Sequence, residues 1–465
     1  MRMPLDPSPD QMRQMGQATL TYLIDFIRGL DDAPADATEG ALDLARRLRG
    51  GPPEDGRPFD DLFAEVQEAV ARTFEFSGPG YLAYIPGGGL FTAALAEFIA
   101  QGVNRYAGLW GPSPAVVQLE ENVARWLCDL FDFPQGAHGI LTSGGSMANF
   151  SAVVTARHAK LGPDFLDGTY YVSAQTHASV TKAASLAGFS ERNLRIVPTD
   201  GELRLDPDAL VQLIQADRKA GLRPFLVVAS AGTTNTGAID PIDVLADIAA
   251  QHELWLHVDG AYGGFFQLTE RGRARFEGIA RADSITLDPH KGLFLPYGTG
   301  ALVVRDGAAL RDAHFEGAEY LQDLAPEGEL PNYSEYSPEL SRDWRGLRVW
   351  MPLVLHGVAA FREALDEKLD LTLRLRDGLA EDPLLSLPWD PQLTVVAFRL
   401  AEGDLEANTK LLRLINRSKR VFLSSTLVQE RYLIRACIVS HRTHADRIDE
   451  CIEIVRKAVA EVNAG

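Results

Sequence analysis

The sequence predicts an α/β protein whose main unit is a mostly parallel central sheet with helices on both faces. Short apolar runs alternate with helix-period segments between about residues 139 and 304, which is typical of such sheets. An amphipathic segment near the start is separated from the rest by a Pro-, Gly- and Asp-rich connector. After about residue 369 the order becomes helix-strand-helix-strand-helix, which indicates a small α+β domain.

Periodicity and composition locate the individual elements. Helices are expected over 11–30, 93–103, 116–131, 145–158, 405–418 and 445–462. Strands are expected over 170–173, 194–197, 225–230, 255–258, 284–287, 301–304, 394–400 and 432–438. The segment 313–341 is acidic and irregular, and such long segments are usually functional or disordered.

These observations divide the chain into three parts. Residues 1–75 form a predicted amino-terminal helical dimerisation segment, residues 76–365 a large domain, and residues 366–465 a small carboxyl-terminal domain. The first helix has no obvious partner within the chain, and a symmetric dimer is the commonest closed assembly. We therefore expect a homodimer. A helix folded back on its own core is the alternative.

Composition and charge exclude several classes of partner. The chain is 46% hydrophobic and 23% charged, with no apolar run long enough to cross a bilayer. Its net charge of −19 argues against nucleic acid and anionic membranes as partners. Cys128, Cys437 and Cys451 give neither a disulfide framework nor a metal-ligand spacing. Residues 1–10 lack the features of a signal peptide, so a cytoplasmic location is expected.

Two strand ends carry the strongest chemical signal. An apolar, β-branched run ends in Asp288-Pro289-His290-Lys291, which delivers a lysine to the carboxyl end of a buried strand. An earlier apolar strand ends at Asp259. A single lysine after a strand is usually just solvated. A strand-end lysine together with a strand-end aspartate suits pyridoxal phosphate, because the lysine holds the aldehyde as a Schiff base and the carboxylate pairs with the pyridine nitrogen.

Three further segments add polar groups at similar positions. Gly145-Ser146 follows a short strand and opens a helix, where unpaired N–H groups and the helix dipole bind anions. No lysine follows these residues, which excludes a nucleotide P-loop. His177 and Thr234 each lie after a strand. Each of these residues alone is explained by a turn or a cap. Capping does not predict four strand ends that carry His, Thr, Asp and Lys.

The order of these motifs resembles the group II pyridoxal-phosphate-dependent decarboxylases, the family of aromatic L-amino-acid decarboxylase. Gly-Gly-Ser, His177, Gly-Thr-Thr, Asp259-Gly-Ala-Tyr-Gly-Gly, Pro-His-Lys291 and Tyr333 follow one another as in that family, over nearly the whole chain. The resemblance implies fold type I of the pyridoxal-phosphate enzymes. It also implies decarboxylation of an L-amino acid to its amine and CO2, in a homodimer that shares its active sites.

The resemblance implies a role for each matching residue. Lys291 would hold the cofactor, Asp259 would keep its ring nitrogen protonated, and His177 would orient the substrate carboxylate. His257, two residues before Asp259 on the same side of the strand, is expected to hydrogen-bond Asp259. The expected cofactor-binding residues are Gly145, Ser146, His177, Thr234, Asp259, Ala261, His290 and Lys291.

Two aromatic loops resemble the segments that line the substrate pocket in the family. They supply the expected substrate-binding residues Tyr84, Ile85, Pro86, Tyr106 and Trp110. Ordinary aromatic core is the alternative for each residue. Because these loops are largely apolar, an aromatic substrate side chain is favoured over a carboxylate one, whose unpaired charge is costly to bury.

Tyr333, in the irregular segment, would donate the proton that replaces CO2 on the substrate carbon. In the family, loss of this tyrosine accompanies aldehyde synthases, which add an oxidative deamination that uses O2. The presence of Tyr333 therefore favours the amine as product. A homologue that only binds the cofactor is a more distant alternative.

Three positions depart from the animal aromatic enzymes. Gly292 follows the lysine where those enzymes have tryptophan, and Gly87 stands where they place a hydroxyl residue near the substrate carboxylate. Asp288 stands in place of an asparagine near the phosphate. Because a carboxylate there would repel the phosphate, Asp288 is not expected to bind it.

Overall fold

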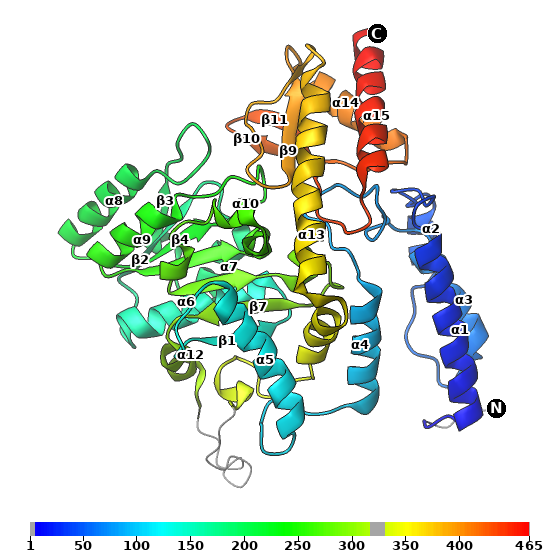
Figure 1. Ribbon diagram of the computed structural model, residues 1–465, viewed down its shortest axis with the longest axis horizontal. Helices are drawn as coiled ribbons and strands as arrows, with labels where there is room; N and C mark the ends of the chain where they lie inside the picture. Colours follow the sequence, from blue (N-terminus) through cyan, green and yellow to red (C-terminus); the bar gives the residue numbers. More distant parts are fainter. Residues whose placement is uncertain (1–4, 317–330, 465) are drawn as a thin grey trace.

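A seven-stranded mixed sheet forms the centre of the computed structural model, which describes residues 5–316 and 331–464 (Figure 1). Along the sheet, the strands are β1 (His138–Thr142), β7 (Gly300–Val304), β6 (Ser284–Leu287), β5 (Trp255–Gly260), β4 (Arg223–Ser230), β2 (Gly168–Ser173) and β3 (Leu194–Val197). The strands from β6 to β3 run parallel, and β7 is antiparallel to both of its neighbours. Every strand predicted in this region is confirmed, as is the mostly parallel α/β class.

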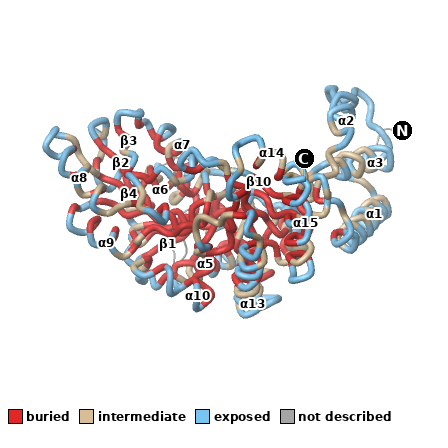
Figure 2. The backbone as a smooth tube through the Cα atoms, turned by 90° about the horizontal axis from the view of Figure 1, so that it is seen from above, coloured by how far each residue is buried: buried red, intermediate tan, exposed pale blue. Residues whose placement is uncertain are grey.

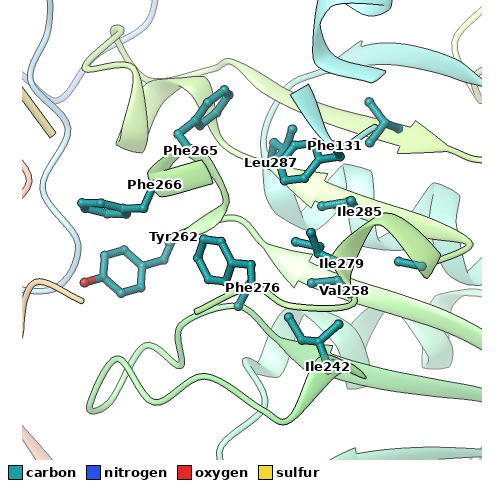
Figure 3. Packing of buried hydrophobic residues seen from close by; sticks show 14 of the residues in the cluster. Phe131, Ile242, Val258, Tyr262, Phe265, Phe266, Phe276, Ile279, Ile285 and Leu287 are labelled. Atoms are coloured by element: carbon teal, nitrogen blue, oxygen red, sulfur yellow. The ribbon is translucent and has the colours of Figure 1, made fainter. Parts of the chain in front are cut away.

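Helices cover both faces of this sheet. One face carries α6 (Gly145–Leu161), α7 (Ala178–Leu186) and α12 (Gly307–His314), and the other carries α5 (Pro114–Leu130), α8 (Pro207–Lys219) and α9 (Ile242–Gln251). Short helical turns are η1 (Glu191–Asn193), η2 (Gly264–Leu268), α10 (Glu270–Arg273), η3 (Ile279–Arg281), α11 (Pro289–Gly292) and η5 (Tyr333–Glu335). Figure 3 shows the core on the second face, where Val258, Ile285 and Leu287 pack with Phe131 and Phe265. Burial on both faces explains why these strands are nearly continuous apolar runs.

Side-chain alternation along β5 prepares the site. Trp255, His257 and Asp259 face the side of the sheet that α6 covers, because alternate residues of a strand point to the same face. The parallel register pairs Asp259 with Ser230 of β4 on one side and with Thr286 of β6 on the other. Polar residues from three strands therefore meet at one edge of the sheet.

A four-stranded antiparallel sheet forms the small domain. Its strands, in order, are β10 (Ser424–Val428), β11 (Arg431–Cys437), β9 (Val395–Leu400) and β8 (Leu385–Ser386), with helices α14 (Leu405–Arg417) and α15 (Ala445–Ala464) packed against them. The predicted α+β domain is confirmed. The sequence did not indicate β8 and β10, because one is very short and the other exposes its middle residues.

The long helix α13 (Gly346–Ala380) joins the two domains. It packs against α4 (Phe91–Val103) and α5 at one end and against α15 at the other. The chain kinks at Gly357, whose φ of 75° glycine adopts without steric cost. The domain boundary predicted between residues 365 and 366 lies inside this helix. A helix that continues through a boundary gives no change in composition to reveal it.

The amino-terminal helices form an arm beside the body of the molecule (Figures 1 and 2). They are α1 (Pro9–Arg28), α2 (Ala41–Arg47) and α3 (Phe59–Val70). Ser8 and Gln11 form a capping box that starts α1, yet none of the residues of α1 is buried. The connector after α1 is attached to the small domain, where the Ala35 N–H donates to the Lys419 carbonyl. No helix within the described ranges is long and apolar enough to span a lipid bilayer.

A fully buried ion pair ties the segment before α13 to α5. Neither Arg342 nor Glu120 has exposed side-chain surface, and Arg342 Nη2 lies 2.8 Å from Glu120 Oε1. The same nitrogen donates to the Leu141 carbonyl in β1, and the Gly346 N–H donates to the second oxygen of Glu120. Arg342 Nε and Nη1 have no hydrogen-bond partner among the described residues. The buried guanidinium charge therefore depends on Glu120.

We predict that Glu120→Gln lowers the free energy of unfolding by about 3–5 kcal/mol, because it leaves Arg342 buried without a counter-charge. Denaturant titration followed by circular dichroism measures this loss. The control Asp449→Asn removes one partner of an exposed pair with Arg374 and should change the unfolding free energy little. A Glu120→Gln protein as stable as the wild type would show that another group neutralises Arg342.

Candidate active site

A cavity of about 280 Å³ lies at the carboxyl ends of β4, β5 and β6, against the amino ends of α6 and α7. This edge is where open α/β sheets bind their ligands. The lining residues are Ser143, Gly144, Gly145, Ser146, Met147, His177, Ser179, Ser230, Gly232, Thr233, Thr234, Asp259, Ala261, Tyr262, Asp288, His290 and Lys291. Every residue that the sequence predicted to bind the cofactor is among them.

The amino end of α6 forms an anion-binding part of the cavity. Gly145 and Ser146 are its first residues, and the first N–H groups of a helix have no intrahelical partner. A Cβ atom on Gly145 would lie 2.9 Å from the Asp288 carboxylate and 3.1 Å from Ala261 Cβ. Glycine therefore allows the amino end of α6 to pack closely against Asp288 and Ala261 at the cavity wall.

Thr234 is held in place from the small domain. Arg435, which is buried in β11, donates from Nη2 to the Thr234 carbonyl at 2.6 Å and from Nη1 to Ser424 Oγ at 3.0 Å. Gly232 enters this turn with a φ of 99°, and a Cβ there would lie 2.8 Å from the Tyr262 ring. Both domains therefore shape the wall of the cavity at Thr234.

Lys291 lies in the short helix α11, directly after β6. Its Nζ is 2.8 Å from Asp288 Oδ2, while Asp288 Oδ1 is buried without a hydrogen-bond partner among the described residues. The sequence left Asp288 out of the site, but the structure places it in the cavity wall as the counter-charge of Lys291. His290 Nδ1 donates to the Thr299 carbonyl at 2.7 Å. Burial lowers the pKa of His290, and Asp288 opposes this effect.

Asp259 accepts two hydrogen bonds at the end of β5. The donors are the Ala261 N–H and Asn149 Nδ2, each at 3.1 Å. The expected direct bond from His257 is wrong: His257 Nε2 lies 3.0 Å from Asn149 Oδ1, and Asn149 bridges the two side chains. Same-face neighbours on a strand are about 7 Å apart, which is too far for direct contact between these short side chains. Burial lowers the pKa of His257 to about 4, although Asp259 opposes this effect.

His177 caps α7 and opens onto the cavity, as expected. Its Nδ1 accepts a hydrogen bond from the Ser179 N–H at 3.2 Å and lies 2.8 Å from Ser179 Oγ. The cap fixes the ring through Nδ1. Nε2 is thus the ring nitrogen left to contact a ligand.

Neighbouring residues explain two unusual glycines. A Cβ on Gly292 would lie 2.7 Å from Phe265 Cβ, so Phe265 fills the space that a larger residue would need. A Cβ on Gly87 would lie 2.8 Å from the His290 carbonyl and 3.4 Å from the Tyr297 ring. Gly87 therefore allows the first aromatic loop to run against His290 and Tyr297.

The first aromatic loop lies beside the cavity but does not line it. Tyr84 is exposed, and its N–H donates to Ser424 Oγ of the small domain at 3.1 Å. Ile85 and Pro86 are buried. None of these three residues is among those that line the cavity of its own chain, and their contact with substrate stays a prediction.

The second aromatic loop lies elsewhere. The Tyr106 hydroxyl donates to the Leu340 carbonyl at 2.8 Å, and the Trp110 N–H donates to Asn332 Oδ1 at 3.2 Å. Neither residue lines the cavity of its own chain, and their role as substrate contacts stays a prediction. Aromatic composition alone does not distinguish a pocket wall from loop packing.

Tyr333 is also absent from the cavity wall. It is fully buried, its hydroxyl donates to Glu121 Oε2 at 2.9 Å, and the Arg342 guanidinium lies 4.8 Å from its ring centroid. Tyr336 packs on His138, with ring centroids 4.1 Å apart. In this arrangement the Tyr333 hydroxyl does not face the cavity of its own chain, and its role as proton donor stays a prediction. Residues 317–330 of the irregular segment lie outside the described residues.

Sequence reasoning missed three residues of the site. Asp288 was set aside because of its charge, whereas Ser179 and Asn149 were not singled out at all. Asn149 lies one helical turn after Gly145, and residues four apart share a helix face. An asparagine on the helix face that otherwise carries Gly145, Ala152 and Ala156 was the available signal.

The groups around the cavity fit pyridoxal phosphate. A helix amino end with serine and threonine hydroxyls suits a phosphate, a buried carboxylate suits a pyridine nitrogen, and a lysine amine suits an aldehyde. Gly145, Ser146 and Thr234 would hold the phosphate, Asp259 the ring nitrogen and Lys291 the aldehyde.

Comparison with known proteins gives the same result. The pyridoxal-dependent decarboxylase conserved domain matches residues 43–401. An aromatic-L-amino-acid decarboxylase from Bacillus atrophaeus is 35% identical, over 99% of this chain and 98% of its own. The crystal structure of Oryza sativa TDC with PLP and tryptamine is similar with a TM-score of 0.93 and 27% identity, over 99% of both chains.

An aldehyde synthase is among the similar structures. The crystal structure of Rhodiola rosea 4-hydroxyphenylacetaldehyde synthase has a TM-score of 0.90 and 25% identity, over 98% of this chain and 99% of its own. These matches confirm the fold, the cofactor and the enzyme class expected from the sequence. The chain belongs to the group II pyridoxal-phosphate-dependent amino-acid decarboxylases.

Proposed function

We propose that this enzyme decarboxylates an aromatic L-amino acid to the corresponding amine. The observation that carries the proposal is the cavity at the strand ends, where Lys291, Asp259 and His177 come together. When bound, pyridoxal phosphate supplies the electron-accepting ring that makes the loss of CO2 possible. Lys291 binds the aldehyde, Asp259 favours the protonated ring nitrogen, and His177 orients the carboxylate that leaves.

Two features support an aromatic substrate. Lys291 is the only lysine or arginine among the described residues that line the cavity, and the cofactor occupies it. A substrate with a carboxylate side chain would therefore be buried without a counter-charge, which is costly. Tyr297 lies against His290 with ring centroids 5.5 Å apart, and Phe76 packs on Tyr297. These two rings form an aromatic surface beside His290, which lines the cavity.

The position of Tyr333 keeps the aldehyde synthase as a second candidate. Its hydroxyl is bound to Glu121 outside the cavity, so this conformation leaves the proton donor for the substrate carbon unassigned. A similar protein of known structure makes an aldehyde. The amine remains the proposed product because Tyr333 is present in the sequence.

We predict that borohydride reduction of the purified protein fixes a phosphopyridoxyl group on the peptide that contains Lys291. Peptide mass spectrometry locates the added mass. Lys368 is an internal control, because it is also buried and burial lowers its pKa, yet it lies outside the cavity and should stay unmodified. A label on Lys368, or unchanged labelling of the Lys291→Ala protein, would disprove the assignment.

We further predict faster CO2 release from phenylalanine, tyrosine or tryptophan than from glutamate or aspartate, because the described residues that line the cavity include no lysine or arginine besides Lys291 to pair with a side-chain carboxylate. Parallel measurement of CO2, amine, aldehyde and peroxide identifies both substrate and product. The molar amount of amine formed should equal the molar amount of CO2 released. Preferred turnover of glutamate contradicts the aromatic proposal, and peroxide equal to CO2 favours the aldehyde synthase.

A homodimer is part of the proposal. Large apolar side chains remain exposed on four helices of the chain. They are Leu20, Leu23 and Ile24 of α1, Leu62, Val66 and Val70 of α3, Leu95, Phe98, Ile99 and Val103 of α4, and Val354 and Leu355 of α13. Large exposed apolar patches usually mark protein–protein contacts. A second copy of the chain is the partner that a symmetric dimer supplies.

We predict that Phe98→Asp shifts the protein from dimer to monomer and lowers activity, because a buried carboxylate in the interface is costly. Phe98 is 73% exposed in the single chain. The control Leu405→Asp changes a 63% exposed leucine at the start of α14, away from those helices, and should leave the dimer intact. Analytical ultracentrifugation measures the masses. A wild-type enzyme that is monomeric and active would disprove the dimer.

A cytoplasmic location is also proposed. All three cysteines are buried as free thiols, which is compatible with a reducing compartment.

A further inference from the structure

A continuous chain of buried hydrogen bonds runs from the core of the sheet to the cavity. Trp255 Nε1 lies 2.8 Å from Ser284 Oγ, which lies 2.8 Å from His257 Nδ1. His257 Nε2 lies 3.0 Å from Asn149 Oδ1. All four residues are at most 4% exposed. Asn149, on α6, is therefore joined to strands β5 and β6 beneath the cavity.

Asn149 is the branch point of this chain. Its Nδ2 lies 3.1 Å from Asp259 Oδ2 and 2.8 Å from Ser179 Oγ. Ser179 Oγ in turn lies 2.8 Å from His177 Nδ1. One amide therefore contacts the partner of the cofactor ring nitrogen and, through Ser179, the imidazole that faces the substrate.

Asn149 Oδ1 fixes the direction of the chain at its buried end. An amide oxygen only accepts, so a neutral His257 carries its proton on Nε2 and donates it to Asn149 Oδ1. His257 Nδ1 is then unprotonated and accepts from Ser284 Oγ, which itself accepts from the indole N–H of Trp255. Burial favours the neutral imidazole, because it lowers the pKa of His257. Thr286 Oγ1, 3.4 Å from the same nitrogen, is a weaker second contact.

Donor and acceptor chemistry also fixes the direction of the hydrogen bonds at the cavity end of the chain. An ionised Asp259 only accepts, so the Nδ2 side of the Asn149 amide must face it. The second Nδ2 hydrogen goes to Ser179 Oγ, whose own proton goes to His177 Nδ1. The Ser179 N–H also donates to Nδ1, which therefore cannot carry a proton. His177 is left with its proton on Nε2. Reversal of the Asn149 amide would set two oxygens against each other at Asp259.

We propose that Asn149 is a positioning residue that holds the Asp259 carboxylate by a hydrogen bond and orients it for the cofactor. The amide can do this because His257 fixes its oxygen side, which leaves both N–H groups for Asp259 and Ser179. The inference rests on the proposed binding of pyridoxal phosphate for its consequence, a protonated ring nitrogen opposite Asp259. The direction of the hydrogen-bond chain is a property of the protein alone.

Asn149→Asp tests the proposal with an isosteric change. It replaces the donating N–H2 group by an acceptor oxygen, so two carboxylates face each other and compete for one proton. The matched control is Asn408→Asp in the small domain. Asn408 is also 1% exposed and also bonds through both ends of its amide, to the Leu400 N–H and to the Gly403 and Asp404 carbonyls. Both variants disturb a buried amide, but only one adjoins the cavity.

Two measurements are made on the full-length protein. The first is ¹⁵N NMR of histidine-labelled wild-type protein, with the His257 signals assigned through a His257→Gln sample. The second is titration with pyridoxal phosphate labelled with ¹⁵N in its ring, which reports affinity and ring protonation. The histidine measurement does not require any variant at Asn149 to fold.

The proposal predicts that wild-type His257 is protonated at Nε2 and bare at Nδ1. Asn149→Asp should weaken cofactor binding about 10- to 100-fold, since it removes a hydrogen bond to a charged group, and should shift the ring nitrogen toward its unprotonated signal. Asn408→Asp should lower thermal stability but leave affinity and ring signal as in the wild type.

A wild-type His257 protonated at Nδ1 instead would overturn the proposal. So would an Asn149→Asp protein that binds the cofactor as tightly as the wild type with a protonated ring. Failure of the wild-type chain to bind pyridoxal phosphate would instead count against the proposed function, and the histidine signals would still decide the direction of the chain.

Discussion

The parallel register of β4, β5 and β6 is the constraint on which the site depends. It sets Ser230, Asp259 and Thr286 side by side, and it brings α11 with Lys291 to the same edge of the sheet. Each strand leads to a helix or turn whose first N–H groups point toward that edge. A one-residue slip of β5 would turn Asp259 to the opposite face of the sheet, among the apolar residues that α9 covers. Catalytic geometry and core packing are therefore specified by the same pairing.

The groups that would bind the anionic cofactor act locally, although the chain as a whole is negatively charged. The chain carries a net charge of −19, and two carboxylates, Asp259 and Asp288, line a cavity suited to an anionic cofactor. Each carboxylate is compensated by a near neighbour: Asp288 by the Lys291 ammonium, and Asp259 by two N–H donors. The amino end of α6 then supplies the favourable field for a phosphate. Short-range dipoles and pairs outweigh the distant surface charge, which water and salt screen.

Residues that lie at strand ends could be predicted from the sequence, and residues that act through them could not. Asp259, Lys291, His177 and Thr234 stand at breaks in the apolar pattern, where a polar residue has no role in the core. Asn149 lies within a helix, and its importance appears only when α6 is placed against β5.

For Tyr333 the sequence indicated a functional residue but not the surroundings of its side chain. Its position in the sequence matched the resemblance, but its side chain lies among α5, β1 and Arg342, with its hydroxyl on Glu121. The aromatic loops could not be placed from the sequence either, because large apolar side chains serve loop packing and pocket walls equally well. The extent of α13 was hidden too, since the helical segment after its kink at Gly357 runs through the predicted boundary without a linker.

The contact between Arg435 and Thr234 limits how far this enzyme can be truncated from its carboxyl end. The recognisable family domain stops at residue 401, while the guanidinium that holds the Thr234 carbonyl lies beyond it in β11. Lys368 of α13 likewise bonds the Thr443 carbonyl. The family match ends at residue 401, and α13 connects the two domains without a break in the chain. Neither feature marks the end of the shortest fragment that would retain an intact site. That fragment reaches into the last sheet of the chain, so the carboxyl-terminal region is a structural component of the catalytic unit rather than an appendage to it.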